Sequence, residues 1–110
     1  MELEVGMYVR TNEGIGTIHK LSRGKIYNVK FNKGHIKKWV SILKEPSFNI
    51  MDMIGEGDYV NGFYVEDVFN TYIYVATGTN YFQSPTIYEQ DIKSIVTKEQ
   101  FEQISYKVSD

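Results

Sequence analysis

Hydrophobic and polar residues alternate with a period of two along much of the chain. Residues 2–10 and 26–31 show this alternation, and residues 72–75 form a short run of aromatic and β-branched residues. Runs of this length between Gly, Asn and Ser clusters are typical of antiparallel β-hairpins. Gly24 and Gly34 fall where a hairpin turn needs a positive φ, which glycine adopts without a Cβ clash. The pattern predicts an all-β protein.

The order of features in the first half returns in the second half. Gly-Met-Tyr-Val at residues 6–9 recurs as Gly-Asp-Tyr-Val at 57–60, an offset of 51 positions. Ser-Ile-Leu at residues 41–43 recurs as Ser-Ile-Val at 94–96, an offset of 53. We interpret the chain as a tandem duplication of a unit of about 50 residues. The alternative is a coincidence among short apolar strands.

The start of each half is similar to a known small β fold. Residues 6–10 (Gly-Met-Tyr-Val-Arg) followed by 14–18 (Gly-Ile-Gly-Thr-Ile) resemble the opening of an SH3-like barrel of the KOW type. In the second half Asn61-Gly62 shortens the turn to a tight hairpin, which departs from the KOW pattern. The resemblance implies two tandem small SH3-like barrels, or a β-sandwich of two related halves.

Helical signals are few. Thr97 and Gln100 have the spacing of a capping box, which predicts a short helix through about Ile104 with Phe101 on its inner face. The stretch 47–53 after Pro46 predicts a similar turn and the connection between the units. Because a unit of about 50 residues without disulfides buries little surface, we expect the two units to share an interface.

Composition excludes several classes of protein. The 110 residues are 42% hydrophobic, which is enough for a packed core, and contain no cysteine, which excludes disulfides and thiolate chemistry. No apolar run approaches the ~20 residues of a membrane span, and residues 1–4 lack a signal-peptide core. We therefore expect a cytoplasmic protein that does not enter a membrane.

The net charge of −2 conceals an asymmetry between the halves. Residues 1–46 carry nine Lys or Arg and four Asp or Glu, a net +5, whereas residues 47–110 carry three and ten, a net −7. We accordingly predict a basic SH3-like unit at 1–46 and an acidic, Tyr-rich unit at 47–110 that ends in a short helix and strand. The split indicates a polyanionic or acidic partner for the basic unit; mutual attraction between the halves is the alternative.

The sequence shows no arrangement typical of an enzyme. The two histidines, His19 and His35, fall in different hairpins and cannot supply the three or four ligands of a zinc site. Phosphate-binding loops, dinucleotide loops and serine nucleophile elbows are absent. We expect no catalytic residues, no metal and no cofactor.

A basic and aromatic stretch between residues 20 and 44 is the strongest candidate for binding. Its candidate partner-binding residues are Lys20, Arg23, Lys25, Lys33, Lys37 and Lys38. Cations at hairpin tips can contact phosphates, and exposed aromatic rings can stack on unpaired bases. The alternative places Tyr27, Val29, Phe31 and Trp39 in the core, with Asn28 and Lys30 on a solvated face.

The acidic unit offers a second surface. The nine aromatic residues between positions 59 and 88 exceed what one small core holds, so some are expected on the surface. The candidate acidic residues are Asp52, Glu56, Asp58, Glu66 and Asp67. Such a cluster can present carboxylates where a partner normally holds phosphates; a solvated acidic face is the alternative.

Two stretches also resemble proteins of a known biological source. Residues 49–54 with 57–62, and residues 92–102, are similar to segments of small proteins of phages and prophages of Gram-positive bacteria. This resemblance implies an accessory role, and such proteins include anti-defence factors, among them anti-CRISPR proteins that bind a host nuclease.

Together these features predict a non-enzymatic, phage-type binding protein. The favoured hypothesis is inhibition of a host nucleic-acid-acting protein, a nuclease or defence complex, by direct contact. The first alternative is a nucleic-acid-binding accessory protein that uses the basic unit. The second is a phage structural or host-takeover component. Self-association remains open.

Overall fold

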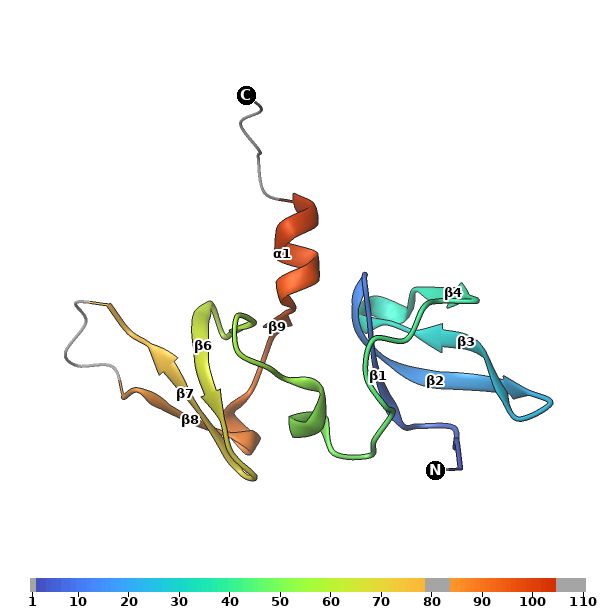
Figure 1. Cartoon of the computed structure of the whole chain (residues 1–110), viewed down its shortest axis with the longest axis horizontal. Helices are drawn as coiled ribbons and strands as arrows, with labels where there is room; N and C mark the ends of the chain where they lie inside the picture. The colour runs from blue at the N-terminus through green and yellow to red at the C-terminus, as the bar shows by residue number, and fades with distance from the viewer. Residues whose placement is uncertain (1, 79–83, 105–110) are drawn as a thin grey trace.

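The computed structural model describes residues 2–78 and 84–104, except for the side chains of Lys33 and Ile104. Two antiparallel sheets and a short helix follow one another along the chain (Figure 1). The prediction of an all-β fold is confirmed.

The first sheet is a four-stranded meander in the order β1-β2-β3-β4. Its strands are β1 (Tyr8–Thr11), β2 (Gly14–Ser22), β3 (Lys25–Lys30) and β4 (Ile36–Lys38), and a 3₁₀ turn, η1 (Asn32–Gly34), precedes β4. Gly24 and Gly34 have φ values of 76° and 79°, which confirms the predicted turn positions. Only glycine and a few polar residues adopt such angles without strain.

The second sheet has the strand order β8-β7-β6-β5-β9. Its strands are β5 (Tyr59–Val60), β6 (Phe63–Val68), β7 (Tyr72–Ala76), β8 (Thr86–Tyr88) and β9 (Ile95–Val96), with a 3₁₀ turn, η3 (Glu89–Asp91), before β9. Asn61 and Gly62 join β5 to β6 with φ values of 53° and 85°. Two successive positive φ angles are those of the tight hairpin expected from Asn-Gly.

Both sheets have a chain segment that returns to pair with their first strand. In the second sheet this segment is β9, which is antiparallel to β5. In the first sheet, isolated bridges join Tyr8 to Ser47 and Thr11 to Ile42 along the free edge of β1. The two halves therefore share one connectivity, as a duplication would produce. The SH3-like assignment itself stays a prediction.

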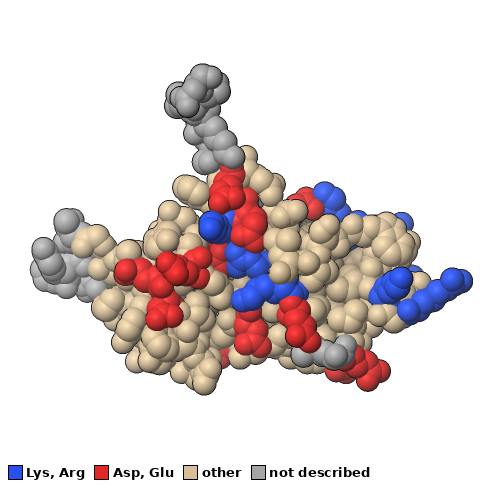
Figure 2. All heavy atoms as spheres, viewed as in Figure 1, with Lys and Arg blue, Asp and Glu red and all other residues tan. Residues whose placement is uncertain are grey.

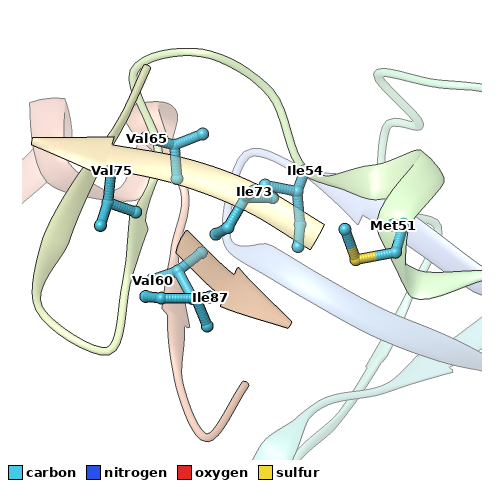
Figure 3. Close-up of a cluster of buried hydrophobic side chains, with 7 residues drawn as sticks. All are labelled: Met51, Ile54, Val60, Val65, Ile73, Val75 and Ile87. Carbon is cyan, nitrogen blue, oxygen red and sulfur yellow. The ribbon is translucent and has the colours of Figure 1, made fainter. Parts of the chain in front are cut away.

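Each sheet has its own hydrophobic core. In the first half the core consists of Met7, Val9, Ile18 and Val29. In the second half it consists of Met51, Ile54, Val60, Val65, Ile73, Val75 and Ile87 (Figure 3). The strand residues of these cores occupy alternate positions, as the period of two predicts.

The connection between the sheets packs against the protein. Its 3₁₀ turn, η2 (Ile50–Met53), buries Met51 and Met53, whereas Phe48 before it is 57% exposed. Met51 belongs to the second core. The predicted turn and packed connection are thus confirmed, and residues 51–54 belong with the second sheet.

A short helix, α1 (Lys98–Ile104), follows β9 and is the only α-helix among the described residues. The Thr97 backbone N–H donates to Gln100 Oε1 at 3.0 Å, and the Gln100 backbone N–H donates to Thr97 Oγ1 at 3.2 Å. This reciprocal pair confirms the capping box. Within residues 2–78 and 84–104, no helix has the length and apolar character of a membrane span.

Candidate functional site

A buried ionic cluster joins the two halves. Arg10 on β1 forms a bidentate pair with Asp58, at 2.5 and 2.6 Å, and a second bidentate pair with Glu99 on α1, both at 2.8 Å. Arg10 also donates to the carbonyl of Met53. We call Arg10, Asp58 and Glu99 the ionic junction. It confirms the expectation that the two units share an interface.

Each carboxylate oxygen of Asp58 accepts two hydrogen bonds. Besides the guanidinium of Arg10, Oδ1 accepts from the Lys98 backbone N–H and Oδ2 from that of Gly55. The side chain is fully buried. A buried carboxylate is stable only when it is paired and hydrogen-bonded in this way. The prediction that Asp58 belongs to a surface acidic cluster is therefore wrong, because its carboxylate is buried and bound by Arg10 and two backbone N–H groups.

Charge in the junction shifts two pKa values. The hydrogen bonds from Arg10 are the main reason that the pKa of Glu99 is lowered, against the opposing effect of burial. The bonds to Glu99 and then Asp58 raise the pKa of Arg10 above its usual value. Both shifts favour the charged forms, so Arg10 and Glu99 stay ionised at neutral pH.

A second cluster lies on the surface of the first sheet and contains Lys20, Tyr27, Lys38 and Trp39. We call it the basic aromatic cluster. The Nζ atoms of Lys20 and Lys38 lie 5.4 and 5.3 Å from the centre of the Tyr27 ring. Trp39 meets Tyr27 edge to face, with 5.4 Å between ring centroids. The hydrogen bond with Lys38 is the main cause of a lowered pKa at the Tyr27 hydroxyl.

The position of Trp39 differs from the core location that was the alternative. Its side chain is 68% exposed, and its φ of 55° lies in the left-handed region. For a bulky residue this backbone conformation is strained, and strained residues gather at functional sites. Asn28 departs from its expected solvated place: it is only 8% exposed, and its Oδ1 atom has no hydrogen-bond partner among the described residues.

The structure disperses the remaining basic candidates. Arg23 and Lys25 are exposed at the β2–β3 turn, where Figure 2 shows Lys and Arg atoms at one end of the molecule. Lys37 pairs with Glu13 at 2.8 Å. Lys33 lies in η1, and its side chain is outside the described part of the structure. Among the described side chains of this set, only Lys20 and Lys38 meet around one ring.

The remaining acidic candidates occupy three places. Asp52 is exposed in η2 and accepts a hydrogen bond from Ser47 Oγ at 2.6 Å. Glu56 lines a shallow hollow with Tyr59, Tyr64 and Phe101. Glu66 and Asp67 are exposed at a bulge in β6, and Figure 2 shows acidic atoms over this sheet. Glu66 and Asp67 are adjacent in the sequence, so their proximity does not depend on the fold.

A continuous group of aromatic rings lies beside that bulge. We call Phe69, Tyr72, Tyr74 and Tyr88 the aromatic face. Phe69 stacks on Tyr72 at 4.8 Å and meets Tyr74 edge to face at 5.2 Å, and Tyr72 contacts Tyr88 at 6.0 Å. Phe69, Tyr74 and Tyr88 are 37%, 44% and 50% exposed. These rings confirm that some aromatics of the second half are on the surface.

Arg10 and Glu99 are site residues that the sequence patterns do not predict. Arg10 stands in an alternating strand where charged residues normally face water, and its partners are 48 and 89 positions away. No local pattern identifies such a pair. The only signal in the sequence is that Arg10 stands beside apolar strand positions, and many exposed arginines share this feature.

The described residues hold no group of three or more His, Asp or Glu placed to bind a metal ion. In comparisons with known proteins, no family model, no curated protein and no solved structure matches the chain. The basic aromatic cluster and the aromatic face are the two exposed surfaces suited to binding.

Proposed function

We propose that this chain is a non-enzymatic binding protein that inhibits a nucleic-acid-acting protein by covering its basic surface. The observation that supports the proposal is the aromatic face with carboxylates at its edge. Asp67 is the cross-strand partner of Tyr74, and Glu89 directly follows Tyr88. Exposed tyrosines bordered by charge are typical of protein interfaces.

The chemistry of this surface favours a cationic partner. Residues 45–92 contain eight Asp or Glu and no Lys or Arg. Tyrosine rings bind guanidinium groups through cation–π contacts, worth about 0.5–2 kcal/mol each, and adjacent carboxylates pair with the same groups. Proteins that act on nucleic acids present Lys and Arg in the groove that holds the phosphates. The aromatic face and its acids fit such a groove.

The phage origin and the role against a host defence complex remain part of this proposal. They rest on the resemblance of residues 49–54 with 57–62, and of residues 92–102, to phage and prophage proteins. An inhibitor of this kind needs no active site of its own, because occupying the partner's groove is sufficient. The acidic candidates Glu66 and Asp67 would then act as substitutes for phosphates.

Affinity capture from a nuclease-treated bacterial lysate tests the proposal. The wild-type chain should capture a protein whose binding or cleavage of nucleic acid the chain inhibits. A bait with Tyr72→Thr and Tyr74→Thr should lose that protein and the inhibition. Tyr64→Thr changes an exposed tyrosine outside the aromatic face and serves as the control. Capture of nucleic acid alone, or equal capture by the double variant, would contradict the proposal.

A further inference from the structure

We propose that the basic aromatic cluster is a binding site for single-stranded nucleic acid. In this site an unpaired base stacks on Trp39, and Lys20 and Lys38 contact the neighbouring phosphates. The inference goes beyond the function proposed above and does not rest on it, because it uses the other half of the chain and a different surface.

The strand register places the two cations on either side of one strand. Lys20 on β2 and Lys38 on β4 are both cross-strand partners of Asn28 on β3. Their backbones are therefore two strand spacings apart, roughly 10 Å. Both Nζ atoms nevertheless lie within 5.5 Å of the Tyr27 ring centre, at 5.4 and 5.3 Å. The sheet thus holds two positive charges beside one aromatic surface.

Trp39 is presented to solvent in a fixed position. Its backbone N–H donates to the Tyr27 carbonyl at 3.3 Å, and its indole ring packs edge to face on Tyr27. The ring is still 68% exposed. An indole held in place has little conformational entropy to lose when a base stacks on it, and such stacking is worth about 1–3 kcal/mol per base.

The charge around the cluster favours an anion. Residues 14–44 contain eight Lys or Arg and no Asp or Glu. Among the described residues, neither Lys20 nor Lys38 forms an ion pair with a carboxylate, whereas Lys37 is paired with Glu13. Unpaired cations release counterions when they meet phosphates, which drives binding at low salt.

The combination of an open ring with cations selects the class of ligand. A polyanion without rings would use the lysines but leave the indole exposed. A duplex would offer phosphates, but its bases are already stacked on one another. A single strand supplies both phosphates and free base faces, as the cluster requires.

The chain carries one tryptophan, so its fluorescence reports on this site alone. Titration with unlabelled oligo(dT) of 15 nucleotides at 20 mM salt should quench Trp39 fluorescence. A 15-base-pair duplex and inorganic polyphosphate should bind more weakly and leave the emission nearly unchanged. Absence of quenching by oligo(dT), or equal quenching by polyphosphate, would overturn the inference.

A pair of charge-reversed variants makes the test specific. Lys20→Glu with Lys38→Glu should weaken oligo(dT) binding at least about tenfold and flatten its salt dependence. Lys44→Glu with Lys93→Glu changes the net charge equally at two exposed lysines outside the cluster, and its binding should stay within about threefold of wild type. Equal losses in the two variants would reject a located site. Circular dichroism checks that both variants keep the β fold.

Discussion

At the scale of single residues, Trp39 combines three properties that a structural residue rarely has together. It is mostly exposed, its backbone has a positive φ, and it packs against Tyr27, the ring that Lys20 and Lys38 approach. A tryptophan in this conformation costs about 1–2 kcal/mol relative to residues that favour the left-handed region. Because most of the indole is exposed, it adds little buried surface to the fold. We therefore expect Trp39 to contribute to binding rather than to stability.

Replacing Trp39 with asparagine separates these contributions. Asparagine adopts the left-handed region readily, so the free energy of unfolding of Trp39→Asn should stay within about 1 kcal/mol of wild type. Binding of a fluorescein-labelled oligo(dT), followed by anisotropy, should weaken by roughly 10- to 100-fold because the stacking surface is lost. A large loss of stability with unchanged binding would show that the indole has a structural role instead.

The residue scale also shows where sequence reasoning is weak. Asp58 and Asp67 look alike in the sequence, since both are acids near strands of the second half. Asp58 is buried because Arg10, 48 positions earlier, supplies a guanidinium, whereas Asp67 remains exposed at a bulge. Burial of a charge depends on a distant partner, and a single sequence contains no information on which partner that is.

At the scale of elements, local chemistry made several predictions reliable. The Asn61-Gly62 turn and the glycine turns depend only on which residues tolerate positive φ. The capping box of α1 depends on two residues three positions apart. Such features can be predicted from the sequence because the groups that determine them are neighbours. The bulges in β2 and β6 were not predicted, because they depend on pairing with another strand.

Helix α1 provides a prediction at this scale. A helix of seven residues is marginal in isolation, so it depends on its cap and on tertiary contacts. Gln100→Ala removes the acceptor for the Thr97 N–H and should lower the free energy of unfolding by about 1 kcal/mol. Gln100→Glu keeps that acceptor and should lose less. Urea unfolding measures both; equal losses would mean that the side-chain oxygen of Gln100 does not stabilise the helix by accepting from the Thr97 N–H.

At the scale of the whole molecule, the charge asymmetry acquires a physical meaning. The sequence predicted two units of opposite charge and an interface between them, but not its chemistry. One cation of the basic half and two anions of the acidic half form the ionic junction, while most other charges remain on the surface. The asymmetry therefore serves both the attachment of the halves and the two exposed surfaces.

The junction makes stability depend on pH in a defined direction. Because the folded protein lowers the pKa of Glu99 below its usual 4.5, the unfolded chain binds this proton first. The stabilisation is complete above that usual value and is lost as the pH falls through the lower folded pKa. Thermal unfolding from pH 7 down to about pH 3 should show a steeper loss for wild type than for Glu99→Gln. Parallel curves would mean that Glu99 does not contribute to acid sensitivity.

Removing one partner of the buried pair tests whether the halves unfold together. Arg10→Met leaves the Asp58 carboxylate buried without its guanidinium, a loss of about 3–5 kcal/mol, and Asp58→Asn should cost a similar amount. Because the residues contact each other, the double variant should lose less than the sum of the single losses. This non-additivity measures the coupling energy between Arg10 and Asp58, which belong to different halves.

The same variants should change the cooperativity of unfolding. Trp39 fluorescence reports on the first half, and near-ultraviolet circular dichroism is dominated by the tyrosines, six of which (Tyr59, Tyr64, Tyr72, Tyr74, Tyr81 and Tyr88) are in residues 47–104. In wild type the two signals should follow one transition in urea, since the junction links the cores. In Arg10→Met the midpoints should separate, because each half then unfolds with its own core. Midpoints that coincide in the variant would show that backbone packing near η2 is sufficient to couple the sheets. The junction would then not be required for coupling.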